Sequence, residues 1–161
     1  METSVTHVGP GEGSKSLWVF GELVVCKIAS CRTGGAYSLF EVVTQPGGGP
    51  PPHVQHREDE AFYVLEGKYA FLVEGRTIRA GAGSLISAPK GNLHAYNNVG
   101  EERGRMLVSQ TPGGLHERFF EEIGEPANDE SRLGSKGKAD VGKIAAIAAG
   151  FGIEIPAASN H

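Results

Sequence analysis

The chain has 161 residues, of which 39% are hydrophobic and 21% are charged, so it is long enough for one ordinary domain with a self-sufficient core. It carries 15 lysine and arginine residues against 19 aspartate and glutamate residues, interspersed along the chain, which disfavours the basic surface that nucleic acid binding requires. No apolar run approaches the roughly 20 residues that cross a bilayer, so membrane insertion is not expected.

Residues 1–16 contain no readable secretory signal, and a cytoplasmic location is the resulting expectation. Cys26 and Cys31 are five positions apart and belong to no repeated spacing. This pattern specifies neither a disulfide framework nor a thiolate metal site. Two reduced thiols are therefore expected, as is usual in the cytosol.

Between residues 17 and 112, short apolar, β-branched or aromatic runs alternate with clusters of Gly, Pro and Asn, a spacing typical of an all-β barrel or sandwich. The predicted strands are 17–20, 22–29, 36–45, 53–56, 60–66, 68–74, 77–79, 84–88, 93–98 and 105–111. Gly67 and Gly75 each follow a glutamate at the end of a run and predict tight hairpins, because glycine tolerates the positive φ that such turns need. The stretch GGGPPP at 47–52 predicts a loop that leads to His53, since proline cannot donate to a strand ladder.

After Pro112 the apolar period changes to that of a helix. Leu115, Phe119 and Ile123 recur every four residues before Gly124, which predicts a short amphipathic helix. The polar stretch 126–139 is expected to be a surface loop.

A second helix is expected to begin at Asp140, whose side chain can cap it, and to dock on the barrel. Its predicted apolar face consists of Val141, Ile144, Ile147, Ala148 and Phe151. The resulting organisation is an N-terminal arm at 1–16, a β-barrel at 17–112 and a C-terminal helical extension with a loop at 113–161.

Histidines near acidic residues are the strongest chemical signal in the strand-rich region. On a strand, His53 and Gln55 project to one face while His56 projects to the other. A turn at 57–59 can bring Glu60 beside the first pair, and His94 begins a later strand from which it can approach across the barrel. Imidazole and carboxylate donors on rigid strands suit a divalent transition metal; hydrogen-bonded core histidines are the alternative.

Two spaced motifs make this region more specific. Gly47, His53, Glu60 and Gly67 fit the pattern G-x5-H-x-H-x(3,4)-E-x6-G, with Gln55 where the second histidine would stand. The second pattern, G-x5-P-x-G-x2-H-x3-N, is met in full by Gly83, Pro89, Gly91, His94 and Asn98. On these residues, the chain resembles the cupin superfamily.

The resemblance implies a double-stranded β-helix, or jelly-roll barrel, here followed by short C-terminal helices. The stretches PPPHVQHREDEAFYVLEG and GGLHERFFEEIGEP are similar to small single-domain cupins akin to quercetin dioxygenase. The resemblance to cupins further implies a divalent transition metal held by His53, Glu60 and His94, with Gln55 at the fourth ligand position. Iron, manganese, nickel, copper and zinc all remain candidates.

The role of Gln55 has three alternatives. Its amide oxygen can bind the metal as a harder and weaker donor than imidazole, which favours manganese or iron over copper or nickel. It can instead hydrogen-bond a metal-bound water, which leaves the two-histidine, one-carboxylate set of non-haem Fe(II) oxygenases. The third alternative is a site that has lost its metal and binds small molecules without one. His56 can replace the missing ligand only if a β-bulge reverses the strand parity.

Other residues are assigned by the face or region on which they lie. Phe62 and Val64 share a face with Glu60, as Tyr96 does with His94, so these three are predicted to line an apolar pocket unless they form plain barrel core. The residues expected to be solvent-exposed are Glu58, Asp59, His7, His116 and His161.

Three functions compete on this sequence. The first is a metal-dependent dioxygenase of a small, aromatic or enol-bearing substrate, with Glu60 as ligand and as candidate base. The second is a metal-dependent isomerase or lyase, and the third is a small-molecule-binding module without turnover. A homodimer is expected from the resemblance, and also because edge strands and the apolar face of the C-terminal helix need a cover.

Overall fold

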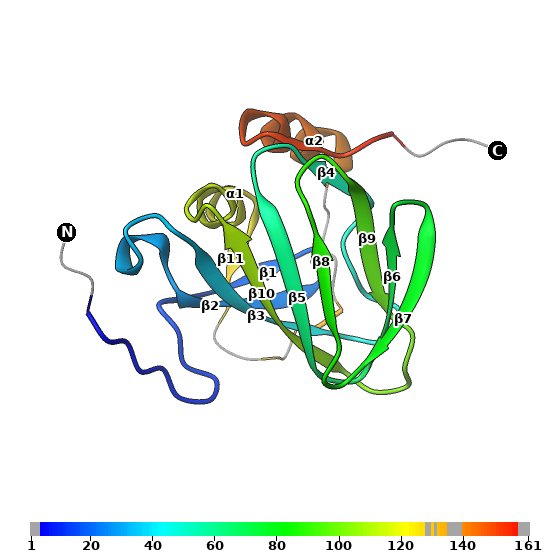
Figure 1. Cartoon of the computed structure of the whole chain (residues 1–161), viewed down its shortest axis with the longest axis horizontal. Helices are drawn as coiled ribbons and strands as arrows, with labels where there is room; N and C mark the ends of the chain where they lie inside the picture. The colour runs from blue at the N-terminus through cyan, green and yellow to red at the C-terminus, as the bar shows by residue number, and fades with distance from the viewer. Residues whose placement is uncertain (1–3, 128–129, 131, 135–139, 158–161) are drawn as a thin grey trace.

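Alternation of inward and outward side chains gives the strands their place in the barrel. Along β5 (Asp59–Glu66), Glu60, Phe62 and Val64 are buried while Tyr63 and Leu65 face outward, as expected for a strand that covers a core on one face. The computed structural model describes residues 4–127, 130, 132–134 and 140–157. In this part of the chain, antiparallel strands form two sheets that face each other (Figure 1).

The first sheet has the order β11-β1-β2-β3-β10-β5-β8 and the second β12-β4-β9-β6-β7. Besides β5, the first sheet consists of β1 (Lys15–Val19), β2 (Glu22–Ile28), β3 (Ser38–Thr44), β8 (Leu85–Ala88), β10 (Gly104–Thr111) and β11 (Glu125–Pro126). The second sheet consists of β4 (His53–Gln55), β6 (Lys68–Val73), β7 (Arg76–Gly81), β9 (Leu93–Asn98) and β12 (Ile153–Glu154). The predicted all-β jelly-roll class is confirmed, and the two-residue strands β11 and β12 are the elements that the strand pattern did not predict.

The main core fills the space between the sheets. Phe62 and Val108 from the first sheet meet Phe71 and Tyr96 from the second, and each of the four is at most 8% exposed. Ring centroids of Phe62 lie 5.2 Å from Phe71 and 5.5 Å from Tyr96, a spacing typical of favourable aromatic pairs. The core therefore fixes the two sheets relative to each other, next to the site described in the following section.

The hairpin predicted at Gly75 is confirmed, because β6 and β7 are paired antiparallel strands. The hairpin predicted at Gly67 is wrong: a tight turn is present, but it joins β5 of the first sheet to β6 of the second, and these two strands do not pair. Gly67 has φ +94° and Gly75 has φ +72°, both in the region that favours glycine. At Gly67 a Cβ would also lie 2.8 Å from the Cα of Gly104. The Gly75 turn sets the register of β6 and β7, whereas the Gly67 turn carries the chain from one sheet to the other.

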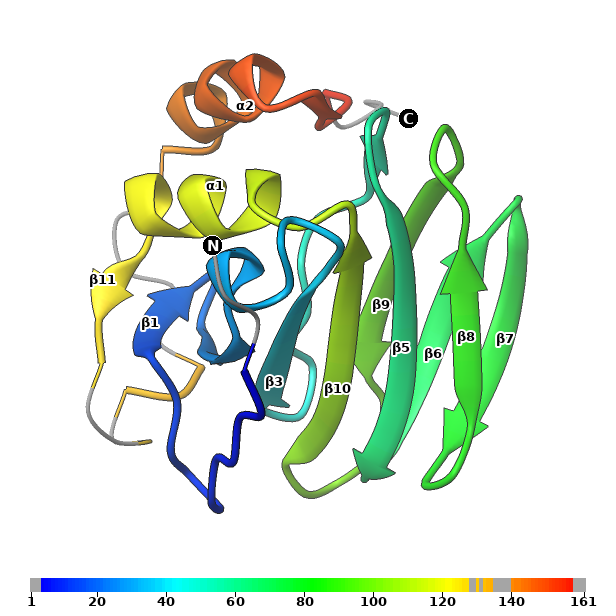
Figure 2. The ribbon, with the colours of Figure 1, turned by 60° about the vertical axis from the view of Figure 1, so that its left-hand side comes forward.

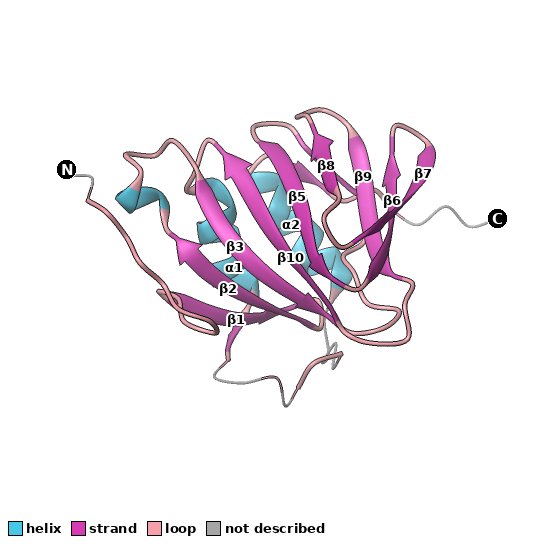
Figure 3. Cartoon of the chain, turned by 60° about the horizontal axis from the view of Figure 1, so that its bottom comes forward, coloured by secondary structure: helices cyan, strands magenta, loops and turns pink. Residues whose placement is uncertain are grey.

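Helices cover one end of the barrel. α1 (Leu115–Ile123) and α2 (Val141–Gly150) lie one above the other there (Figure 2), and both are on the same side of the strands in Figure 3. A short 3-10 helix, η1 (Ser30–Arg32), precedes β3. Asp140 caps α2 as predicted, because its side chain accepts a hydrogen bond from Lys143 N at 3.1 Å.

The packing of α2 differs in part from the prediction. Ala148 is fully buried against Phe119 of α1 and Ile153 of β12, so α2 packs on these elements rather than directly on the barrel core. Val141, which the sequence placed on the apolar face, is 55% exposed because it lies in the first turn. No helix in the described part of the chain is long and apolar enough to span a membrane.

Candidate metal centre

Two histidines of the second sheet point to the same spot inside the barrel. His53 on β4 and His94 on β9 are direct cross-strand partners, so both side chains project to one face. His53 Nδ1 lies 2.9 Å from Pro51 O, and His94 Nδ1 lies 3.1 Å from Asn92 O. Because a carbonyl only accepts, each Nδ1 carries a hydrogen, which leaves each Nε2 as the ring nitrogen that could bind a metal, the arrangement found in metal-binding histidines.

Glu60 approaches from the opposite sheet. Its Oε2 lies 2.8 Å from His94 Nε2, and its Oε1 accepts a hydrogen bond of 3.0 Å from Gln110, the cross-strand partner on β10. Ligand atoms of His53, Glu60 and His94 all lie within 4.8 Å of one another. The two sheets thus bring together the three donors that could hold a metal ion.

Gln55 completes this cluster. Its Nε2 lies 2.7 Å from Glu60 Oε2 and 3.4 Å from His53 Nε2, whereas its buried Oε1 has no hydrogen-bond partner. Rotating the amide by 180° exchanges its oxygen and nitrogen. Gln55 Oε1 would then lie where Nε2 is now, 2.7 Å from Glu60 Oε2. Two oxygens this close repel each other unless a cation or a proton lies between them. The unpaired oxygen and this exchange fit a bound metal ion.

The local charges shift the pKa values of these donors in different directions. Burial and the neighbouring His94 lower the pKa of His53 to about 4. Burial disfavours the charged form of Glu60, but the hydrogen bond to His94 and the nearby imidazoles outweigh it and lower its pKa to about 2. Burial likewise opposes the charged form of His94, but its hydrogen bond to Glu60 raises the pKa. At neutral pH, Glu60 is therefore ionised and His53 neutral, the states in which both bind a metal.

His116 and Glu58 were expected at the surface, and this expectation is wrong. His116 is 4% exposed and Glu58 is 1% exposed, and His116 Nδ1 lies 3.0 Å from Glu58 Oε1. His116 Nε2 faces Gln55 Nε2 at 3.5 Å. Burial opposes protonation of His116, but Glu58 outweighs it and raises the pKa. The α1 helix thus adds a third histidine to the region around the metal donors.

A signal for His116 is present in the sequence. His116, Phe119, Phe120 and Ile123 stand at i, i+3, i+4 and i+7, the spacing of the buried stripe of a helix. The predicted stripe began at Leu115 and therefore missed His116. Glu58 has no comparable signal, because an acidic residue in a turn is usually solvated.

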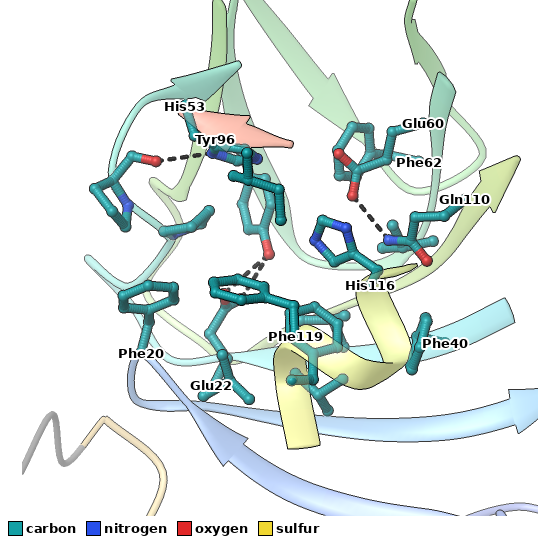
Figure 4. A pocket seen from close by; sticks show the side chains of 18 of the residues that line it. Phe20, Glu22, Phe40, His53, Glu60, Phe62, Tyr96, Gln110, His116 and Phe119 are labelled. Carbon is teal, nitrogen blue, oxygen red and sulfur yellow. Dashed lines mark hydrogen bonds between the residues drawn. The ribbon is translucent and has the colours of Figure 1, made fainter. Parts of the chain in front are cut away.

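The cluster lies at one end of a pocket with about 50 Å³ of free space. Figure 4 shows Glu60, Gln110 and His116 close together and Glu22 across the pocket from them. Tyr96 donates to Glu22 at 2.9 Å. The apolar lining includes Phe20, Phe40, Phe62, Val108, Phe119 and Ile153.

The predicted pocket residues separate into two groups. Phe62 and Tyr96 line the pocket, whereas Val64 is fully buried in the main core and is not part of the lining. Val64 lies further along β5, beyond the end that carries Glu60.

The remaining charged and histidine residues lie away from the cluster. His56 points outward and pairs with Glu154 at 2.9 Å, so no bulge turns it inward. Asp59 is exposed as expected and accepts a hydrogen bond from Lys90 N. His7 is exposed, and His161 lies outside the described residues.

Comparison with known proteins gives the family. Residues 40–109 match the model of the Cupin domain family. The chain is 31% identical over 137 residues to quercetin 2,3-dioxygenase of Bacillus subtilis (strain 168), a match that covers 78% of this chain and 40% of the dioxygenase. The protein belongs to the cupin superfamily and resembles quercetinase-like members, although it spans well under two thirds of that relative's length.

Solved structures support the same fold. KdgF from Halomonas sp. superposes with a TM-score of 0.61 at 18% identity, covering 69% of this chain and 96% of that one. The polyketide cyclase RemF from Streptomyces resistomycificus superposes with a TM-score of 0.59 at 25% identity, covering 67% of this chain and 80% of that one.

Proposed function

We propose that the protein is a metal-dependent dioxygenase of a small, aromatic or enol-bearing substrate. One observation carries this proposal: His53 Nε2, His94 Nε2 and Glu60 Oε2 converge at the end of a pocket whose other walls are mainly apolar. Two histidines and one carboxylate are the donor set of non-haem Fe(II) oxygenases. Similarity to quercetin 2,3-dioxygenase favours redox chemistry over the other activities of this fold.

The metal would be held by His53, Glu60 and His94, with the amide oxygen of Gln55 as a fourth ligand. A bound redox-active divalent ion would supply the activation of oxygen and the polarisation of a substrate oxygen. The protein residues hold the donors in place from two sheets, and the aromatic walls exclude water from the substrate. Iron and manganese are favoured, because a carboxylate and an amide oxygen are harder donors than imidazole.

Glu60 fits the role of a ligand better than that of a base. Its two oxygens contact His94, Gln55 and Gln110, so a proton acceptor would have to leave these partners. Its pKa near 2 also differs strongly from the neutral values that suit a general base. We therefore propose that proton transfer, where the reaction needs it, uses another group of the pocket.

The test combines metal analysis with oxygen uptake. Protein purified without chelators is expected to contain close to one equivalent of iron or manganese, and to consume oxygen with a panel of catechols, diketones and flavonols. His53→Ala is expected to lose both signals, whereas the matched variant His56→Ala keeps them, because His56 points away from the cluster. A metal-loaded protein that consumes no oxygen with the whole panel would refute the dioxygenase proposal.

Likeness to a polyketide cyclase at 25% identity favours non-redox chemistry as the second candidate. In that case the ion would only polarise a carbonyl group. Turnover that zinc supports without oxygen would select this alternative. Ligand binding without turnover under either condition would instead select the binding-module alternative.

We also propose that the protein forms a homodimer. Tyr63, Leu65 and Leu85 are 44%, 39% and 64% exposed on β5 and β8, and β8 ends the first sheet. An apolar face beside a free strand edge favours pairing with a second copy. The buried side of α2, by contrast, packs against α1 and β12. Light scattering is expected to give twice the chain mass, reduced to one chain mass by Leu85→Glu.

A cytoplasmic location is the third part of the proposal. Cys26 and Cys31 are both free, and reduced thiols are typical of that compartment. Because Cys26 is buried, the thiols are labelled under denaturing conditions directly at cell lysis. Labelling of both would support this location, and their blockage would contradict it.

A further inference from the structure

His116 is held so that one ring nitrogen is occupied and the other faces the pocket. Nδ1 lies 3.0 Å from Glu58 Oε1, and an ionised carboxylate can only accept, so this nitrogen carries a hydrogen. Nε2 points the other way, toward Gln55 Nε2 at 3.5 Å. His116 is also part of the pocket lining. The imidazole thus has a defined orientation relative to both the metal donors and any bound ligand.

Aromatic neighbours fix the plane of the ring. The centroid of Phe120 lies 4.7 Å from that of His116 at an angle of 83°, and the centroid of Phe119 lies 5.8 Å away at 77°. These edge contacts and the Glu58 hydrogen bond hold the His116 ring in this orientation before a ligand binds. A polar group preorganised in this way binds a ligand at a lower entropic cost.

His116 is not placed to bind the same ion as the other donors. The group of ligand atoms within 4.8 Å of one another contains His53, Glu60 and His94 and does not include His116. Its Nε2 instead faces Gln55 Nε2, and the His116 ring lies in the pocket (Figure 4). A ligand next to the metal donors would therefore meet this nitrogen as a separate hydrogen-bonding group.

We propose that His116 is a substrate-contacting residue and that Glu58 is the residue that positions it. In the bound substrate, one oxygen faces the cluster of His53, Glu60 and His94, and the neighbouring carbon carries a hydroxyl group. His116 Nε2 hydrogen-bonds this hydroxyl group. This inference rests on the proposed function, since it needs a metal beside the ligand. It narrows the substrate class to compact, largely apolar compounds with two oxygens on neighbouring carbons, as in catechols and enols of α-hydroxyketones.

Ligand binding, rather than turnover, provides the test. Catechol and phenol differ in the second hydroxyl group, and their affinities for manganese-loaded protein are measured anaerobically by calorimetry. His116→Phe is expected to reduce the advantage of catechol over phenol by about five- to tenfold, the effect of one hydrogen bond. His116→Gln, which keeps a polar group, should restore part of it. His56→Phe is the matched control and should leave the advantage unchanged, because His56 is exposed.

Glu58 is tested by the position of the hydrogen on His116. Nitrogen-15 NMR, recorded at a pH where the imidazole is neutral, is expected to show the hydrogen on Nδ1 in the wild type and distributed between the two nitrogens, as a mixture of tautomers, in Glu58→Leu. Glu58→Gln should restore the wild-type spectrum, because its amide oxygen also accepts from Nδ1. A purely structural role of Glu58 would not move this signal.

Metal content separates failure of this inference from failure of the proposed function. If His116→Phe binds wild-type amounts of manganese and keeps the catechol advantage within twofold, the contact role of His116 is refuted while the metal site stands. If the wild type binds no metal after reconstitution, the proposed function is refuted and the inference falls with it.

Discussion

At the scale of single residues, Gln55 is the position where the chain departs from the motif of its family. The amide holds the donors together through Glu60 and leaves its own oxygen unpaired. Gln55→His replaces this oxygen with an imidazole, a stronger donor for divalent transition metals. We expect the variant to bind nickel and copper at least tenfold more tightly, with a smaller gain for manganese. Competition with a chromophoric chelator measures this, and weaker binding of all three ions would show that the amide is the preferred ligand.

His53 makes a separate contribution to the pH dependence of the metal-free protein. Its pKa is about 4 in the fold against 6.5 when unperturbed. Between these values the unfolded chain takes up a proton that folded His53 does not, so this residue lowers the free energy of unfolding as pH falls from 6.5 to 4.

We expect metal-free His53→Gln to lose less stability than the wild type over this range, by up to about 3 kcal/mol. Urea unfolding at pH 6.5 and pH 4.5 measures the difference. Equal losses in the two proteins would contradict the lowered pKa of His53.

At the scale of elements, the loop before β4 holds the metal-bearing strand in register. Gly47 N donates to Asn98 O at 2.8 Å, and Asn98 N donates to Gly48 O at 2.9 Å, so this loop pairs with the end of β9. Gly49 lies against the same strand with φ +150°, where a Cβ would be 2.0 Å from Tyr96 O. The loop is thus packed against β9 immediately before the chain reaches His53.

Gly49→Ala is therefore expected to push the loop from β9, to cost more than about 3 kcal/mol and to reduce bound metal. Gly47→Ala is the matched control. Gly47 also has positive φ, at +77°, but a Cβ there meets no atom within 4 Å. The free energy of unfolding of this control should fall by only about 1–2 kcal/mol, because of backbone strain. Thermal unfolding and metal analysis test both variants, and equal effects would contradict the role of close packing at Gly49.

The elements that sequence reasoning located are those whose signal is local. Strand parity separated His53 from His56 correctly, and glycine located the turns at Gly67 and Gly75, of which only the second closes a hairpin. The burial of Glu58 was not accessible in this way, because it depends on how α1 docks over the barrel end and brings His116 to it. The position of Val64 relative to the pocket likewise depends on how far the cavity extends along β5.

At the scale of the whole molecule, α1, β12 and the loop before β4 cover the pocket from several directions. Phe119 and His116 of α1, Ile153 of β12 and Pro50 and Pro51 of the loop before β4 all line it. Because β12 pairs with β4, the cover is hydrogen-bonded to the strand that carries His53. A large ligand must therefore displace secondary structure, and not only side chains, to reach the metal donors.

This cover predicts selection by size. The free space is about 50 Å³, whereas pockets for drug-sized ligands are roughly 300–1,000 Å³. We expect single-ring catechols to support oxygen uptake at least tenfold faster, per unit concentration, than quercetin, which has three rings. Ile153→Ala should narrow this difference, because it removes part of the cover, at a cost of about 2–4 kcal/mol in stability. Faster uptake with quercetin in the wild type would show that α1 and β12 move aside when substrate binds.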